Sequence, residues 1–221
     1  MTDRLILTVA VLGGTGNLGP GLALRWSRAG YKVLIGSRKA EKAQRVAAEL
    51  NQILGIDAIS GMTNQEAARE ADICVLTVNH TAHRSALESL KPALKGKILV
   101  DTTARIDFRD PRPPAPPSAA RVAQDILGTE VAVAAAFQTV PASVLRKNLD
   151  DPLDMDVFVC SDEARAAKEA IRLAEGGGMR AFNAGGLENA IVAEGLVAML
   201  LSMNKQYRSK TGTLRVVGIT K

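Results

Sequence analysis

The stretch Thr8-Val9-Ala10-Val11-Leu12-Gly13-Gly14-Thr15-Gly16-Asn17-Leu18-Gly19 decides the fold class. Residues 8–12 predict a strand, and the apolar periodicity from residue 18 to residue 29 predicts a helix. Between them, Gly14, Gly16 and Gly19 satisfy G-x-G-x-x-G, whose glycines allow a tight turn, close approach to a pyrophosphate, and helix-on-strand packing. The stretch therefore predicts a dinucleotide-binding turn with the pyrophosphate at the helix start, and a glycine-rich turn without a ligand is the alternative.

The same alternation of strand and helix continues through the first two thirds of the chain. Apolar runs alternate with Ala-rich helical stretches, which is typical of parallel strands joined by crossover helices. The predicted strands are residues 8–12, 32–35, 56–59, 73–78, 97–100 and 131–136, and the predicted helices include 18–29, 39–54 and 64–70. Six such strands predict an α/β, Rossmann-type, doubly wound and mostly parallel sheet.

Beyond residue 142 the pattern weakens and predicts a small C-terminal α+β extension. It contains a strand at 157–160, a helix at 163–175, a strand at 179–182 and an apolar helix at 187–203. That helix is apolar on more than one stripe, so we expect it to pack against a second subunit in a homodimer. We therefore divide the chain into a nucleotide-binding domain, 1–142, and an extension, 143–221, that completes the substrate site and the dimer interface. Five of the nine prolines lie between residues 107 and 117 and predict an extended surface loop.

The composition bounds the function. A chain of 221 residues suits one buried core, and with only 3% aromatic residues it lacks the stacking platforms of nucleic-acid binders. We expect the net charge of +5 to attract small polyanions such as phosphorylated cofactors. Cys74 and Cys160 lie in apolar runs and predict unpaired core thiols. With no targeting segment and no apolar run of about 18 residues, the chain is expected to be soluble, cytoplasmic and free of membrane.

The end of the second strand predicts the choice of dinucleotide. An NAD site would place an acid here to bind the ribose hydroxyls, but the sequence reads Gly36-Ser37-Arg38, with Lys42 one turn later. Ser37 can donate a hydrogen bond, Arg38 can fork onto a 2′-phosphate, and Lys42 adds a charge. These residues favour NADP over NAD, and ordinary solvated charges are the alternative.

The ends of the later strands predict the surroundings of the nicotinamide. His80 follows the fourth strand, and Val78, Ala104 and Ala142 could approach the ring through main chain or small side chains. His80 and His83 lie three residues apart with no third nitrogen, sulfur or suitably placed carboxylate in their neighbourhood, so no metal site is predicted.

Several segments together resemble the NADPH-dependent coenzyme F420 reductase family. They are Gly13 to Gly19, Gly36-Ser37-Arg38, Val75-Leu76-Thr77-Val78, Ala184-Gly185-Gly186-Leu187-Glu188-Asn189 and Leu214 to Ile219. The resemblance implies hydride transfer between NADP(H) and the 8-hydroxy-5-deazaflavin coenzyme F420. It carries the family's NADP contacts onto Thr15, Gly16, Asn17, Leu18, Ser37, Arg38, Lys42 and Ala142. The sequence departs from members with Pro-Trp after the fourth strand and His-Thr after the sixth, because it has Asn79-His80 and Gln138-Thr139 there.

Hydride transfer between two planar carriers needs neither a nucleophile nor a metal, so the protein's work is orientation. Small residues could leave room for the two rings, with tight core packing as the alternative: Ala134, Ala135, Ala136, Ala142 and Ala184. Backbone N–H groups near Gly185-Gly186 could stabilise negative charge on the deazaflavin. Two other functions stay open: an NADPH-dependent reductase of a flavin, metal chelate or imine, and a non-catalytic NADP(H) sensor.

Overall fold

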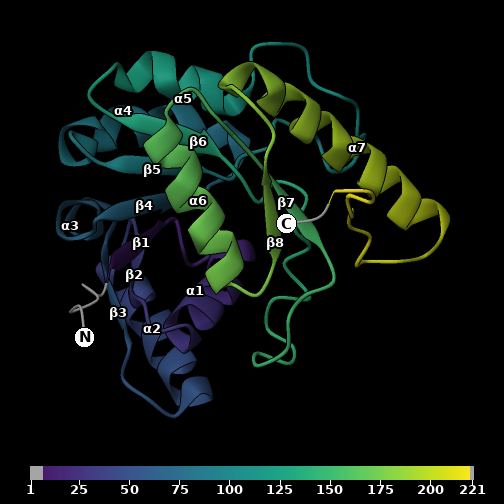
Figure 1. The fold of residues 1–221 in the computed structure, drawn as a ribbon. Coiled ribbons are helices and arrows are strands. Elements are labelled where there is room, and N and C mark those ends of the chain that lie inside the picture. Colours follow the sequence, from purple (N-terminus) through teal and green to yellow (C-terminus); the bar gives the residue numbers. More distant parts are fainter. Residues whose placement is uncertain (1–6, 220–221) are drawn as a thin grey trace.

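The computed structural model describes residues 7–219 as one eight-stranded sheet with helices on both faces (Figure 1). The strands are β1 (Thr8–Leu12), β2 (Lys32–Ser37), β3 (Ile59–Thr63), β4 (Ile73–Leu76), β5 (Ile98–Asp101), β6 (Ala132–Ala135), β7 (Asp156–Ser161) and β8 (Arg180–Asn183). The helices are α1 (Leu18–Arg28), α2 (Ala40–Leu54), α3 (Asn64–Glu70), α4 (His80–Leu94), α5 (Ala119–Leu127), α6 (Ala164–Gly176), the 3-10 turn η1 (Leu187–Asn189) and α7 (Ala190–Gln206).

The strand order is β3-β2-β1-β4-β5-β6-β7-β8. The first six strands are parallel, β7 runs antiparallel to β6, and β8 is parallel to β7. The order of β1 to β6 is that of the doubly wound dinucleotide-binding fold, with its switch point between β1 and β4. The predicted fold class is confirmed, and the two late strands extend the same sheet.

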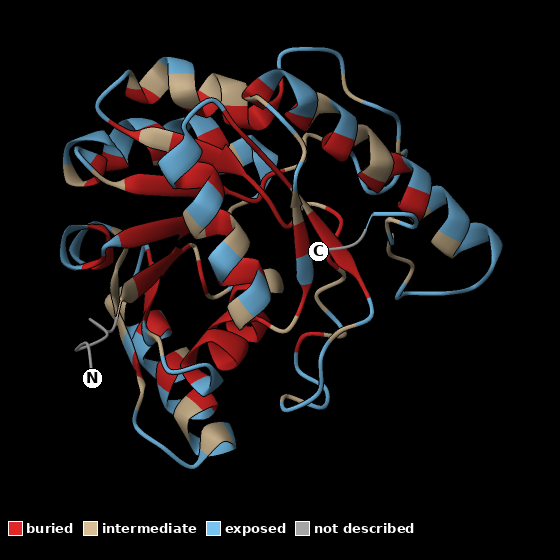
Figure 2. Ribbon diagram, in the orientation of Figure 1, coloured by how far each residue is buried: buried red, intermediate tan, exposed pale blue. Residues whose placement is uncertain are grey.

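Both faces of the sheet are covered, which explains why its strands read as continuous apolar runs. In β1, Val9 and Val11 belong to the core under α1, α2 and α6, whereas Ala10 and Leu12 belong to the core under α3, α4 and α5. Figure 2 shows the central strands almost wholly buried between these two layers.

Side-chain caps fix two of the helix starts. Thr63 and Glu66 form a reciprocal capping box at the start of α3. Ser118 accepts the N–H of Arg121 and opens α5, a helix that follows the proline-rich loop and that the sequence pattern did not reveal.

The sequence predicts the third strand at residues 56–59, and that prediction is wrong, because β3 begins at Ile59. The side chain of Asn51 accepts the N–H groups of Ala58 and Ile59 and donates to the Ile59 carbonyl, so the chain before Ile59 forms a turn. The strand then continues through Gly61, where a Cβ would lie 2.2 Å from the Ala43 carbonyl carbon of α2. Close contact with α2 therefore requires glycine at this place in β3.

Helix α7 lies away from the sheet and extends outward from the body (Figure 1). Its inner side packs on Ile106, which directly precedes the proline-rich loop, through Val197 and Ala198, whereas Val192, Met199 and Met203 are exposed. The span Leu187–Gln206 is long and apolar enough to cross a membrane by length and composition, with mean hydropathy 1.2, contrary to the expectation that the chain has no such run. Length and apolar composition alone are weak evidence for a membrane-spanning helix, because the core helices of soluble proteins share both properties. Here 39% of the apolar window is buried inside the protein.

Both cysteines are free and buried, as predicted. Burial raises the pKa of the Cys74 thiol to about 12 and that of Cys160 to about 11. Both thiols are therefore unreactive at neutral pH.

Candidate active site

The carboxyl ends of the parallel strands lie along one edge of the sheet, and hydrogen bonds join the residues that follow each strand to the end of a neighbouring strand. The donors and acceptors are Gly14 N–H to Gly36 O (2.9 Å), Thr77 N–H to Leu12 O (2.9 Å), Thr102 N–H to Leu76 O (3.2 Å) and Ala136 N–H to Asp101 O (3.1 Å). The predicted site residues, scattered from Thr15 to Ala142 in sequence, follow the strand ends that these bonds connect.

The glycines of the first loop are glycine for different structural reasons. A Cβ at Gly13 would lie 2.6 Å from Val78 Cγ1, one at Gly14 would lie 2.6 Å from the Val11 carbonyl oxygen, and one at Gly19 would lie 2.6 Å from Gly14 Cα. These three glycines are required by close contacts within the protein itself. A Cβ at Gly16 would meet nothing closer than 3.8 Å, so no atom of the described residues excludes a side chain there. The open space at Gly16 fits a ligand that must approach the backbone.

The amino end of α1 is free to receive an anion. Its N-cap, Asn17, makes no side-chain capping bond, and no acidic residue lies in the first turn. Gly16 and Asn17 are exposed, and Thr15 and Leu18 are half-buried beside them. Uncapped N–H groups and the positive end of the helix dipole favour a phosphate at this position.

The loop after β2 adds positive charge next to this helix end. Ser37 is buried and accepts the N–H of Lys39 at 3.4 Å through its hydroxyl. Arg38 and Lys42 are exposed, and neither side chain bonds to another residue within 7–219. Two free cations beside a buried hydroxyl can bind a second phosphate.

Asn64 connects these two loops, and the sequence analysis missed it. Its Oδ1 accepts the N–H of Gly13 at 2.9 Å. The same oxygen lies 2.6 Å from where a Cβ of Gly36 would be, so glycine in β2 makes room for it. The signal in the sequence was Gly36, because a glycine inside a strand marks a close approach of another group. The sequence does not show which group approaches, because Asn64 lies in another βα unit.

On the other half of the edge, the predicted residues border the loops after β4, β5 and β6. Val78 is half-buried against Gly13, and His80 is the exposed first residue of α4. Ala104 and Ala142 are half-buried in the loops after β5 and β6. The structure thus places all four along the same edge as the glycine loop.

His83 is not an isolated histidine. Its Nε2 lies 2.6 Å from Oδ2 of Asp101, and the two side chains are only 6% and 0% exposed. The sequence analysis missed this partner, because Asp101 follows 18 residues later at the end of the neighbouring strand. Within the described residues, no group of three or more His, Cys, Asp or Glu side chains is arranged to hold a metal ion.

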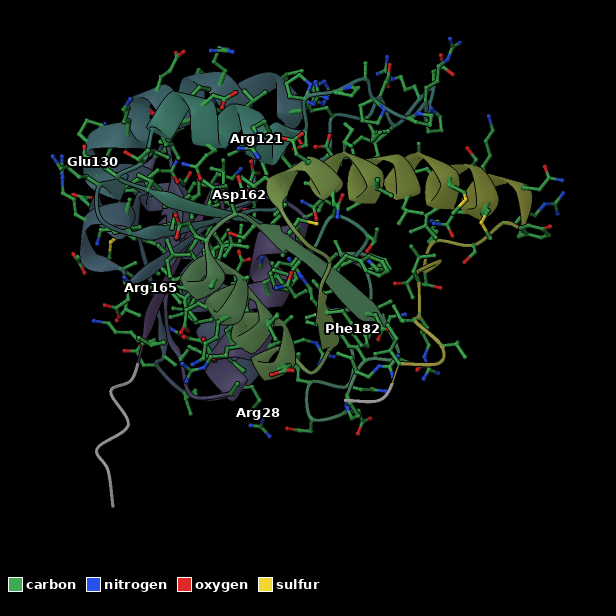
Figure 3. All side chains as sticks on the ribbon, turned by 45° about the horizontal axis from the view of Figure 1, so that its top comes forward. Arg28, Arg121, Glu130, Asp162, Arg165 and Phe182 are labelled. Carbon is green, nitrogen blue, oxygen red and sulfur yellow. The ribbon has the colours of Figure 1, made fainter. Side chains whose placement is uncertain are left out.

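Two N–H groups of the segment before α7 are not free for the expected role at the deazaflavin, whereas the Gly186 N–H stays a candidate. The N–H of Gly185 donates to Asn183 Oδ1 and that of Leu187 donates to Asp162 Oδ1, both at 2.9 Å, so these two groups already have partners within the protein. Arg121 and Asp162 lie beside one another near the start of α7 (Figure 3), with Nη2 and Oδ2 2.7 Å apart. The Leu187 N–H, helped by Arg121, holds the pKa of the Asp162 carboxyl below its usual range.

The alanines expected to leave room for two rings divide into two groups. Ala134, Ala135 and Ala136 are fully buried and belong to the cores on either face of the sheet, so tight packing explains them. Ala142 and Ala184 are half-buried and remain available to a substrate.

Comparison with known proteins gives a consistent result. A family profile described as "NADP oxidoreductase coenzyme F420-dependent" matches residues 8–105. The F420-dependent NADP reductase of Methanothermobacter thermautotrophicus is 38% identical over 99% of this chain and 98% of its own length. That of Methanocaldococcus jannaschii is 38% identical over 96% of this chain and 99% of its own. A solved structure described as a putative F420-dependent NADP reductase from Arthrobacter superposes with a TM-score of 0.79, covering 96% of this chain and 99% of that one at 24% identity.

Proposed function

Because the chain belongs to the F420-dependent NADP reductase family, we infer that it is an oxidoreductase that transfers hydride reversibly between NADP(H) and coenzyme F420. Its near full-length match to these relatives covers both parts of the chain, so the whole activity is carried over. Its two substrates are therefore NADP(H) and the 8-hydroxy-5-deazaflavin.

We propose that the first half of the edge binds the adenosine and phosphate parts of NADP(H). Thr15, Gly16, Asn17 and Leu18 present the amino end of α1 to the pyrophosphate, and Ser37, Arg38 and Lys42 bind the 2′-phosphate. The observation that carries this assignment is the open space at Gly16, next to two cations without side-chain partners among residues 7–219.

We propose that the second half of the edge receives the nicotinamide, bordered by Val78, His80, Ala104 and Ala142. NADP(H) and the deazaflavin supply the hydride chemistry when bound. The protein's task would be to orient the two rings so that hydride can pass between them, which in general requires reacting atoms about 3–3.5 Å apart, and to exclude water. His80 and Gln138 stand where other family members have Trp and His. We therefore assign to these two residues the differences between the deazaflavin side of this chain and that of those members.

We propose that the parts of the chain before and after residue 142 bind different substrates. Residues 1–142 supply all the NADP contacts assigned above, and residues 143–221 cover the deazaflavin side and provide α7. The sheet is continuous across this boundary, so the division is functional rather than architectural.

We propose that α7 forms a homodimer interface and that the protein is soluble in the cytoplasm. Val192, Met199 and Met203 are 46–61% exposed on a helix whose other side is buried, and unpaired buried thiols fit a reducing compartment. Sedimentation would test the dimer: replacing Met199 and Met203 by Lys should give monomers, and an unchanged mass would exclude this face.

The activity is tested by mixing the purified protein anaerobically with NADPH and oxidised F420. Bleaching of the visible deazaflavin band together with loss of nicotinamide absorbance is expected. Flavin, ferric chelate and a cyclic imine serve as alternative acceptors under the same conditions. Faster NADPH oxidation with one of these would redirect the assignment, and tight NADPH binding without turnover would indicate a sensor.

A further inference from the structure

The buried pair of His83 and Asp101 has no task in the binding scheme above. Asp101 ends β5, its side chain is fully buried, and the partner of Oδ2 is His83 Nε2 at 2.6 Å. Because neither side chain is open to solvent, neither is placed to contact a substrate directly. A buried side-chain hydrogen bond also contributes only about 0.5–1.5 kcal/mol of net stability, because both groups give up hydrogen bonds to water on folding. Stability alone therefore does not explain this pair.

The contacts of Asp101 reach three loops. Through His83, Asp101 holds the first turns of α4, which begins at His80. Its Oδ1 accepts the N–H of Thr103, one residue before Ala104, at 2.9 Å. Its main-chain oxygen accepts Ala136 N–H and Gln138 Nε2, both at 3.1 Å, in the loop that leads to Ala142.

These are the loops to which we assign the nicotinamide. The residues at their ends, His80, Ala104 and Ala142, come from separate βα units, and neighbouring strands at this edge are joined mainly by main-chain bonds. A single residue that bonds to all three loops fixes their relative positions, and a displacement of about 1 Å can cost about 100-fold in a reaction that depends on orientation.

We propose that Asp101, with His83 and Gln138, is a positioning unit that sets the nicotinamide ring for hydride transfer. The proposal rests on the function assigned above. It predicts an effect on the turnover number and on the environment of the bound ring, with little effect on affinity, because most binding contacts lie on the other half of the edge.

The experiment compares Asp101→Ala with Asp101→Asn. Alanine removes both side-chain bonds, whereas the asparagine Oδ1 can still accept the Thr103 N–H and its Nδ2 can donate to His83. We expect Asp101→Ala to lower kcat for F420 reduction about 100-fold with a Kd for NADPH within about threefold of wild type, and Asp101→Asn to recover most of the loss. Equal kcat in wild type and Asp101→Ala would overturn the proposal, and so would equal losses in both variants.

Gln124→Ala is the matched control. Gln124 also bonds to three main-chain groups, those of Gly128, Val131 and Val133, but at the amino end of β6, opposite the site. It should lower the unfolding temperature while leaving kcat within about twofold of wild type. A comparable loss of kcat in this control would show that general destabilisation is responsible and would reject the positioning role.

Two further measurements keep the test decisive. If Asp101→Ala does not fold, Gln138→Ala removes the half-buried amide bond to the Asp101 carbonyl. Because Gln138 is also assigned to the deazaflavin side, this variant is measured by the emission of NADPH bound without acceptor, and an emission equal to wild type would then reject the proposal. The fluorescence of NADPH bound without any acceptor reports the ring environment directly. A changed emission in Asp101→Ala at unchanged Kd supports positioning even if F420 proves not to be the acceptor, and an unchanged emission counts against it.

Discussion

The two halves of the sheet edge are built in different ways. At β1 and β2, close backbone contacts are made possible by missing side chains, at Gly13, Gly14, Gly19 and Gly36. At β4, β5 and β6, side chains add to the main-chain bonds between neighbouring strand ends, through Thr77, Thr102, Gln138 and the His83–Asp101 pair. A phosphate is bound largely by main-chain N–H groups and needs open backbone, whereas a reacting ring needs loops that are fixed relative to one another.

The largest effect expected in the glycine-built half is at Gly16. Gly16→Ala adds a methyl group that meets no described protein atom closer than 3.8 Å but occupies the space assigned to the pyrophosphate. We expect NADPH affinity to fall about 100-fold, measured by calorimetry, with an unchanged unfolding temperature. Gly19→Ala is the contrast: its Cβ would lie 2.6 Å from Gly14 Cα, so it should cost about 1–3 kcal/mol of stability. A destabilised Gly16→Ala would show that the fold, not the ligand, requires this glycine.

The next effect tests the charge beside this loop. Arg38→Ala should weaken NADPH binding about 10- to 100-fold, because a charge-assisted hydrogen bond contributes about 1.5–3 kcal/mol. NADH affinity should not change, since NADH lacks the 2′-phosphate. Lys39→Ala, at the exposed neighbouring residue, is the control and should leave both affinities close to wild type. Equal losses for NADPH and NADH in Arg38→Ala would contradict a role in reading the phosphate.

Asn64 tests whether the glycine-built half also depends on a side chain. Asn64→Ala leaves the Gly13 N–H without its acceptor and should lower the free energy of unfolding by about 1–2 kcal/mol in urea titration. Asn64→Asp keeps an acceptor and should recover much of that stability. Its added negative charge near the pyrophosphate should nevertheless weaken NADPH binding. Equal stability of the two variants would show that the bond from the Gly13 N–H to Asn64 does not stabilise the loop.

The smallest effect concerns Asp162, whose side chain bonds to Arg121 and to the Leu187 N–H outside both halves of the sheet edge. The pKa of Asp162 is lowered by the Leu187 N–H and by Arg121, so its stabilising contribution is present above the unfolded pKa near 4 and is lost as pH falls through the lower folded pKa. Because the Asp162 side chain is 44% exposed, we expect Asp162→Asn to cost less than about 1 kcal/mol at pH 7. The difference from wild type should narrow in urea titrations below about pH 4. A difference that stays constant down to acid pH would show that the carboxylate charge is not involved.

Local sequence determined the fold class and the nucleotide half of the site. The glycine loop, the Gly36-Ser37-Arg38 strand end and the apolar runs are short-range signals, because a turn, a helix start and a buried strand each impose their needs on neighbouring residues. The start of β3 was misplaced, since the capping side chain of Asn51 competes with the strand for the same N–H groups.

Only the tertiary structure decided the side-chain connections. Asn64 meets Gly13 across 51 residues of sequence, His83 meets Asp101 across 18, and Gln138 reaches the Asp101 carbonyl across 37. Each pairing follows from strand order, which places the ends of separate βα units side by side. No local pattern encodes that neighbourhood, because the residues concerned become adjacent only when the sheet is assembled.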